Sequence, residues 1–295
     1  MDINYELYKV FYYVATTLSF SEASKQLFIS QSAVSQAIKA LENRLDQTLF
    51  IRSTKRVQLT PEGEILLRHV EPAMNLIKRG ESQLMDSAST GGQIRIGASD
   101  TICRYFLVPY LEKFHKEFPN VHIKVTNQTS IKCVELLDSG QVDLIIVNYP
   151  NAYISKPYTL KSIAKFRDIF VANDSFDELR DTIIPLKKLL NYPILMLERQ
   201  STTSEFLHNL FQQRQLDLIP EVELSSNDIL IDLARIGLGI AFVPDYCFPN
   251  GTDNLFQLAI DEPLPERALA LAYNNQMPLP KAAQEFLNYF TEIDL

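Results

Sequence analysis

Glycine and cysteine are scarce in this chain, and each shortage excludes a class of protein. Only nine glycines occur among the 295 residues, well below the ~7% of average proteins, so most are expected in turns and helix caps. The three cysteines, Cys103, Cys133 and Cys247, lie far apart and form no C-x-x-C pair. The sequence therefore has no disulfide framework, and we expect it to work in a reducing compartment.

Long apolar runs and targeting signals are also missing. No run approaches the ~20 apolar residues that a membrane-spanning helix needs. The segment Met1–Glu6 lacks the basic and apolar regions of a signal peptide. We therefore expect a cytoplasmic protein without a membrane partner.

The motifs that usually mark an enzyme are absent. There is no G-x-x-x-x-G-K-[ST] loop, no G-x-G-x-x-G after a strand, no G-x-S-x-G elbow and no H-E-x-x-H helix. The four histidines, His69, His115, His122 and His208, are scattered without metal-ligand spacing. We expect no catalytic residues, no metal and no cofactor.

The charge is unevenly distributed. The chain carries 28 Lys and Arg against 36 Asp and Glu, a net charge of −8, which by itself argues against a nucleic-acid partner. Residues 24–56, however, hold six basic and two acidic side chains, whereas residues 93–295 account for the whole −8. A small basic segment is therefore joined to an acidic remainder.

The first 92 residues are typical of a helical domain followed by a long helix. Three short helices are expected within residues 1–46, with Ser19 and Ser30 as N-caps. Extended segments at 48–52 and 57–59 enclose a basic turn, and Thr60 and Pro61 then start a long helix. Its apolar seam has heptad-like spacing suited to pairing with another helix: Leu66, Val70, Ala73, Ile77 and Leu84. Pro72 is expected to kink this helix or force a restart, and residues 87–92 form a polar linker.

From Gln93 onward strands and helices alternate, which predicts an α/β domain built from βαβ units. Strands are expected at 94–97, 121–125 and 142–147, with helices at 102–118 and 130–138. A second set follows, with strands at 169–172, 194–197, 222–224 and 238–244 and helices at 205–213 and 229–236. The apolar run at 142–147 favours a parallel sheet covered on both faces. We predict lobe 1 from residues 93–163 and 267–295, and lobe 2 from residues 164–266.

Residues 15–63 resemble the DNA-binding region of the LysR-type transcriptional regulators. The resemblance rests on many residues at fixed spacing: Ser19-Phe20-Ser21-Glu22-Ala23, Ser30-Gln31-Ser32-Ala33-Val34-Ser35-Gln36, Leu49-Phe50-Ile51-Arg52 and Leu59-Thr60-Pro61-Glu62-Gly63. The remainder fits the family's effector domain in length and element order. The resemblance implies a winged helix-turn-helix domain (1–60), a dimerisation helix with hinge (61–92) and a two-lobed effector domain of periplasmic-binding-protein type (93–295). It also implies a homotetramer and contact with RNA polymerase.

Leu18 and Asp46 depart from the family pattern, which usually has glycine at both positions. Asp adopts left-handed backbone geometry more readily than most residues, so Asp46 is a tolerable replacement. Neither departure removes an expected DNA contact.

Polar and basic side chains gather where a recognition helix meets DNA. Such a helix points its N-terminal residues at base edges in the major groove, and basic wing residues suit phosphates or the minor groove. Gln pairs with adenine edges, whereas Ser and Lys serve bases or phosphates. The alternative is a solvated polar helix face. The expected DNA-binding residues are Ser30, Gln31, Ser32, Ser35, Gln36, Lys39, Arg52, Lys55 and Arg56.

Polar residues also follow the ends of the predicted strands, where ligands bind in α/β sheets. Hydroxyls and helix N-termini suit a carboxylate, whereas Asp100 favours an amine or hydroxyl, so the effector is a carboxylate or an amphoteric metabolite. The alternative is that these residues are only helix caps. The expected effector-binding residues are Ser99, Asp100, Thr101, Thr129, Ser130, Asn148, Gln200, Ser201, Thr202, Thr203 and Asn227.

The leading interpretation is a sequence-specific regulator that binds double-stranded DNA and responds to a small molecule. A solute-binding receptor and an enzyme on the same scaffold are the alternatives, and fold alone does not separate them. The helix-turn-helix pattern disfavours the first, and the missing catalytic groups disfavour the second. Cys103 lies near a predicted helix start, where a thiol is either a low-pKa redox sensor or a buried inert residue.

Overall fold

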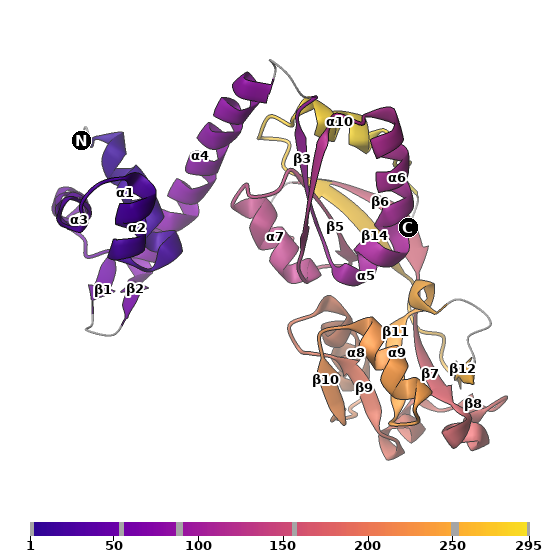
Figure 1. Cartoon of the computed structure of the whole chain (residues 1–295). Coiled ribbons are helices and arrows are strands. Elements are labelled where there is room, and N and C mark those ends of the chain that lie inside the picture. Colours follow the sequence, from indigo (N-terminus) through magenta and orange to yellow (C-terminus); the bar gives the residue numbers. More distant parts are fainter. Residues whose placement is uncertain (1–2, 53–55, 87–90, 155–157, 249–253, 294–295) are drawn as a thin grey trace. The chain divides into compact units, whose positions relative to one another are not determined.

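The computed structural model describes residues 3–52, 56–86, 91–154, 158–248 and 254–293 (Figure 1). The chain divides into two compact units, Met1–Met85 with Asp138–Gln141, and Asp86–Leu137 with Val142–Leu295. Within the described residues, no helix is both long and apolar enough to cross a membrane.

Three short helices open the first unit, and their boundaries follow from capping. These helices are α1 (Tyr5–Thr17), α2 (Phe20–Leu27) and α3 (Gln31–Leu45). The Ser19 hydroxyl accepts a hydrogen bond from the Glu22 N–H at 3.2 Å, and the Ser30 hydroxyl accepts one from Ala33 N–H at 3.2 Å. Both predicted N-caps are confirmed.

Each of these helices ends at a non-glycine residue with left-handed backbone geometry. The φ angles are 48° at Leu18, 56° at Phe28 and 52° at Asp46. A side chain with a Cβ is strained in this region, and Asp tolerates it better than Leu or Phe. The expectation for Asp46 therefore holds, and Phe28 emerges as a strained position.

The core of this domain lies between the three helices and the strands that follow. Phe11, Val34, Ile38 and Leu41 are fully buried, and the Phe50 ring packs against Phe11 at 5.5 Å between centroids. Phe50 begins β1 (Phe50–Arg52), which pairs antiparallel with β2 (Val57–Leu59). This hairpin is the predicted wing.

A single long helix, α4 (Pro61–Asp86), follows the wing. The Thr60 hydroxyl accepts the Gly63 N–H at 3.0 Å, as expected of an N-cap. The helix continues through Pro72, so the expected restart there is wrong. A proline inside a helix removes only one backbone hydrogen bond, and the neighbouring turns keep their own hydrogen bonds. Of the predicted seam, Val70 is buried in the domain core, whereas Ile77 and Leu84 are 57% and 79% exposed.

Lobe 1 of the second unit is a five-stranded sheet in the order β4-β3-β5-β14-β6. Its strands are β3 (Gln93–Ala98), β4 (His122–Asn127), β5 (Leu144–Tyr149), β6 (Thr159–Phe166) and β14 (Arg267–Tyr273). Ile146 points to the face covered by α6 (Val108–Glu117) and α10 (Lys281–Leu287), whereas Ile145 points to α7 (Ser130–Asp138). Figure 1 shows α6 and α10 together on one face and α7 on the other.

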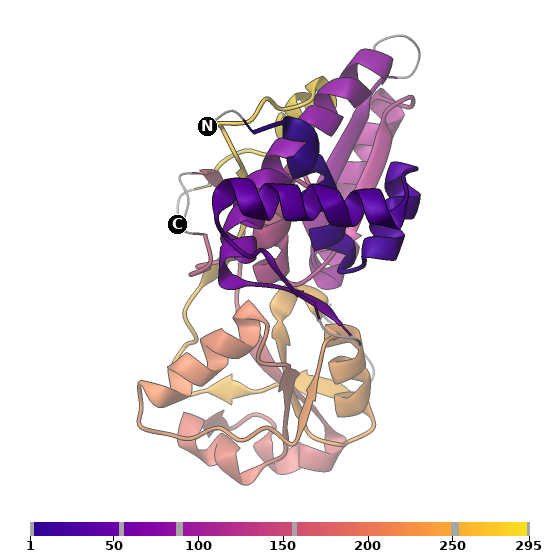
Figure 2. The same ribbon diagram turned by 90° about the vertical axis from the view of Figure 1, so that its left-hand side faces the viewer.

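Lobe 2 repeats this arrangement with the strand order β10-β9-β11-β7-β12. Its strands are β7 (Asp168–Asn173), β9 (Ile194–Leu197), β10 (Val222–Leu224), β11 (Ile240–Pro244) and β12 (Leu255–Gln257). The sheet lies between α8 (Thr202–Gln212) and α9 (Asn227–Arg235), which is clear in Figure 2. A small additional sheet pairs β8 (Ile183–Ile184) with β13 (Ala259–Ile260).

Both large sheets are mixed, which corrects the expectation of parallel sheets. Strands β4, β3 and β5 run parallel, but β14 is antiparallel to β5 and to β6. In lobe 2, β7 is antiparallel to β11 and β12. The antiparallel strands belong to the two connections between the lobes, which join strand to strand without the crossover helix that a parallel pair requires. Strand β6 was not predicted, and it carries lobe 1 to Phe166, three residues past the expected boundary at 163.

The expected helix at 102–118 is also divided. The chain forms α5 (Asp100–Ile102), then a π-helical segment (Cys103–Leu107), and only then α6. Such π-helical turns are rare and often lie at functional sites.

Replacement of Phe28 by glycine is expected to stabilise the first unit by about 0.5–1 kcal/mol. The Phe28 ring is 94% exposed, so its removal loses little buried area, and glycine relieves the left-handed strain. Amide hydrogen exchange of α2 and α3 in the full chain measures the change. Leu18→Gly is the control with a smaller expected gain, because Leu18 is only 47% exposed; faster exchange in Phe28→Gly would contradict the prediction.

Candidate DNA-binding surface and ligand cleft

The N-terminal end of α3 presents its predicted readers to solvent. Gln31, Ser32, Gln36 and Lys39 are exposed, and Ser35 is half-buried. Ser30 is also exposed, although its hydroxyl caps the helix and lies 2.9 Å from the Ser32 hydroxyl. The polar end of this helix is therefore accessible to a groove of DNA.

Arg52 of the wing is held against α3. Its Nη1 donates to the Ser35 hydroxyl at 3.0 Å, and its Nη2 lies 3.8 Å from Glu42 Oε2. Glu42 in turn accepts the backbone N–H of Leu49 at 2.8 Å, which ties the wing to the helix. Recognition helix and wing thus form one polar surface. Arg56 is exposed beside β2, and Lys55 lies outside the described residues.

A cavity of 330 Å³ lies between the two lobes. Every predicted effector residue except Gln200 lines it, and these side chains come from the strand ends and helix starts of both sheets. Gln200 is exposed on the turn between β9 and α8 and is not among the residues that line the cavity. Its assignment to the effector site stays a prediction.

The cavity has further lining residues that the sequence did not reveal. Asn127, Leu197 and Pro244 end strands β4, β9 and β11, so the rule that ligands bind at strand ends would have found them. Tyr246 follows β11 without any such signal. The complete additional set is Asn127, Gln128, Leu197, Glu198, Ser225, Pro244 and Tyr246.

Several lining hydroxyls are helix caps, as the alternative interpretation held. Ser99 accepts the Ile102 N–H at 3.3 Å, Thr129 accepts the Lys132 N–H at 3.3 Å, and Ser201 accepts the Ser204 N–H at 3.1 Å. Because the capped helix ends face the cavity, these residues both cap helices and line the cleft.

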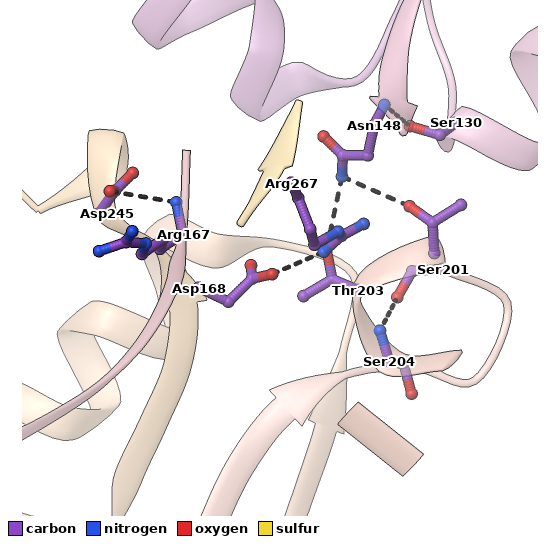
Figure 3. A network of polar contacts seen from close by, with 10 residues as sticks. Ser130, Asn148, Arg167, Asp168, Ser201, Thr203, Ser204, Asp245 and Arg267 are labelled. Atoms are coloured by element: carbon purple, nitrogen blue, oxygen red, sulfur yellow. Dashed lines mark hydrogen bonds and ion pairs between the residues drawn. The ribbon is translucent and has the colours of Figure 1, made fainter. Parts of the chain in front are cut away.

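Two asparagines bridge the lobes across the cleft. Asn148 at the end region of β5 donates from Nδ2 to the hydroxyls of Thr202 and Thr203, each at 3.4 Å. Asn227 at the start of α9 donates from Nδ2 to the Thr101 hydroxyl at 3.0 Å. Ser130 supports the first bridge by accepting the Asn148 backbone N–H at 3.1 Å (Figure 3). Side chains that line the cleft thus also hold the two lobes together.

The comparisons with known proteins identify the family. Residues 5–64 match the description "Bacterial regulatory helix-turn-helix protein, lysR family", and residues 87–293 match "LysR substrate binding domain". The chain belongs to the LysR family.

The chain is similar to an HTH-type regulator over almost its whole length, and it shares its fold with two solved structures. An uncharacterized HTH-type transcriptional regulator of Methanocaldococcus jannaschii is 27% identical and covers 99% of this chain and 100% of its own. The structure of full-length CbnR complexed with its target DNA is 18% identical, with a TM-score of 0.65 and coverage of 98% and 99%. The regulatory domain of CcmR from Synechocystis PCC6803, in complex with 2-PG, is 22% identical, with a TM-score of 0.61 over 67% of this chain and 95% of its own.

An ion pair lies behind the cleft of this LysR-family protein, where the chain passes between the lobes. Arg267 Nη1 lies 2.6 Å from Asp168 Oδ2, and both residues are almost fully buried. The same nitrogen donates to the Thr203 hydroxyl at 3.3 Å, so the pair contacts the cleft wall (Figure 3). The guanidinium also lies over the rings of Phe166 and Phe206 at 5.2 and 4.9 Å.

Cys103 does not have the character of a redox sensor. Burial, assisted by the negative charge of Asp100, raises the pKa of its thiol to about 11. Its sulfur lies 3.1 Å from Asn127 Oδ1, toward which the thiol donates. A thiol with a raised pKa is mostly protonated and therefore weakly nucleophilic, which supports the inert interpretation. Among the described residues no cluster of three His, Cys, Asp or Glu side chains is placed to hold a metal ion.

Arg267→Leu is expected to destabilise the effector domain by about 3–5 kcal/mol, because it leaves Asp168 buried without its partner. The double variant Arg267→Leu/Asp168→Leu should recover much of this loss, since it buries no charge. Urea unfolding of the full chain measures both. Lys132→Leu, which removes an exposed lysine that contacts Glu135 at 2.8 Å, should leave the midpoint nearly unchanged. If Arg267→Leu also left the urea midpoint of the unmodified chain nearly unchanged, the ion pair would have no structural role.

Alkylation of Cys103 tests its raised pKa. With a pKa of about 11, the thiolate fraction at pH 7 is more than ~100-fold below that of a free cysteine. Iodoacetamide should therefore modify Cys103 slowly in the folded protein, faster as the pH rises toward 11, and rapidly in urea. Mass spectrometry of the peptide follows the reaction; modification at the rate of the unfolded chain at pH 7 would refute the assignment.

Proposed function

We propose that this LysR-family chain is a transcriptional regulator that binds a DNA operator through α3 and the β1–β2 wing, and that a small molecule in the lobe cleft modulates it. The observation that carries the proposal is the presence of both family domains, at residues 5–64 and 87–293, in one chain. The similar CbnR structure is a complex with its target DNA, and the CcmR regulatory domain is a complex with 2-PG.

The polar surface of the first unit supports the DNA-binding part. Gln36 and Lys39 are exposed on α3, and Arg52 joins the wing to this helix through Ser35. Gln reads base edges, whereas Arg and Lys contribute mainly through phosphates. We therefore assign base reading to α3 and backbone contacts to the wing.

The exposed apolar side chains of α4 support self-association. Ile77 and Leu84, seven residues apart, are 57% and 79% exposed, and this spacing suits a helix pair. We propose a dimer through α4 that reads two half-sites of a partly palindromic operator, and a tetramer when effector domains also associate. Transcription places the protein with the chromosome, in the cytoplasm, and makes RNA polymerase a further partner.

An enzymatic role is not proposed, because the relatives compared are regulators. The cleft then acts by differential affinity: an effector that binds one arrangement of the lobes more tightly than another shifts the population of the DNA-binding forms.

Arg52→Ala is expected to weaken binding to the intergenic DNA flanking the gene and to reduce the slope of log affinity against log salt by about 1, because one phosphate contact is lost. Fluorescence anisotropy at several salt concentrations measures both quantities. Lys9→Ala removes a positive charge from α1 of the same domain and is the matched control. An unchanged affinity and slope in Arg52→Ala would exclude the wing from the interface.

The variant Gln36→Ala tests base reading separately from the phosphate contacts. It should cost about 1–3 kcal/mol at the preferred operator base pair and relax the preference there, with an unchanged salt slope. Binding to a set of operators that differ at single positions measures the preference. If Gln36→Ala kept the base preference of the unmodified chain at every operator position, Gln36 would not be a base-contacting residue.

A further inference from the structure

We propose that the lobe cleft selects a small zwitterion, a molecule that carries both an ammonium group and a carboxylate, rather than a dianion such as a dicarboxylate or a phosphate ester. This inference rests on the proposed function of the cleft as an effector site. It concerns the chemical class of the effector, which is determined by the charges and unpaired polar atoms of the cleft.

The charged residues of the cleft are acidic. Asp100 and Glu198 are exposed at its wall, and no Lys, Arg or His occurs among the described residues that line it. The nearby Arg267 lies behind Thr203 and is paired with Asp168. An effector with two or more negative charges would therefore meet two carboxylates without a compensating side-chain cation, whereas an ammonium group is attracted to them.

Two buried acceptors in the cleft have no hydrogen-bond partner among the described residues. Asn148 and Asn227 are 9% and 4% exposed, and their side-chain nitrogens are used in the bridges between the lobes. Within the described part of the chain, the Oδ1 atom of each accepts no hydrogen bond. A buried acceptor that lacks a donor is unfavourable, and a ligand that supplies N–H groups removes the penalty. Both oxygens therefore favour an ammonium-bearing ligand.

The N-terminal ends of three helices, in contrast, favour a negatively charged group on the ligand. Helices α7, α8 and α9 begin at Ser130, Thr202 and Asn227, all of which line the cavity. Their N-terminal ends carry partial positive charge and suit one carboxylate.

Tyr246 provides a donor for the same carboxylate. Its hydroxyl is buried, and no partner for it occurs among the described residues. Burial raises the pKa of Tyr246 well above its ordinary value, so the hydroxyl stays protonated and can donate. The cleft thus combines acceptors for an ammonium group with donors for a carboxylate, in a cavity of 330 Å³ that fits a small metabolite.

The test compares matched ligands on the full-length chain. The twenty common L-amino acids are screened by thermal shift and then by calorimetry. Each amino acid that binds is compared with its 2-hydroxy acid and with its decarboxylated amine, and succinate and glycerol 3-phosphate are added as dianions. We expect at least one amino acid to bind, both matched analogues to bind at least tenfold more weakly, and neither dianion to compete.

Single substitutions in the cleft test which side chains contact the bound amino acid. Asn227→Leu should weaken the bound amino acid at least tenfold, whereas Asn227→Asp, which keeps the acceptor oxygen, should retain binding. Asp100→Asn should weaken the amino acid several-fold without changing the affinity of its 2-hydroxy acid. Asp217→Asn, which removes a carboxylate outside this cavity, is the matched control and should have no effect.

The outcomes separate this inference from the proposed function. Binding of succinate or glycerol 3-phosphate in preference to every amino acid, or no binding by any amino acid, overturns the zwitterion class. Anisotropy with intergenic DNA on the same samples tests the regulator itself. Intact DNA binding with a dianion as the only ligand would refute the class alone, whereas loss of all DNA binding would refute the proposed function.

Discussion

Arg267 and Asp168 begin the two strands that lie on either side of the passage between the lobes, β14 and β7. Burying these two charges is favourable only while they remain paired, because each alone would lack compensation in a dry environment. Their 2.6 Å contact therefore holds the ends of the two connections together. The pair thus fixes the point where the chain passes between the two sheets, and the hydrogen bonds of Asn148 and Asn227 join the lobes beside it.

The pair is linked to the ligand site through one hydroxyl. Thr203 accepts from Arg267 on one side and from Asn148 on the other, so lobe 1, lobe 2 and the hinge meet at this residue (Figure 3). The Nδ2 atoms of Asn148 and Asn227 donate to the opposite lobe, whereas within the described residues their Oδ1 atoms accept no hydrogen bond. Occupancy of the cleft and the relation between the lobes are thus coupled through the same side chains, which is what a ligand-responsive regulator requires.

Positive and negative charge are concentrated in different parts of the chain. The acidic surplus lies wholly in residues 93–295, whereas residues 24–56 are basic. The DNA-binding unit must attract phosphates, and the second unit, whose cleft also carries Asp100 and Glu198, should be repelled by them. An acidic total is thus compatible with a DNA-binding protein, because attraction to DNA depends on the local patch rather than on the sum.

The local elements of this fold follow from short sequence patterns. Ser19, Ser30 and Thr60 predicted helix starts because a side-chain cap is a local interaction, and the strands at 194–197 and 222–224 have the predicted bounds. The strand-end rule found ten of the cavity residues for the same reason. No such pattern specifies the mixed sheets, strand β6, the place of Tyr246 in the cleft or the Arg267–Asp168 pair, which appear only in the folded chain. These depend on residues far apart in the chain, such as the partners 99 positions apart in the ion pair, and no local pattern specifies which distant partner a strand or a buried charge will find.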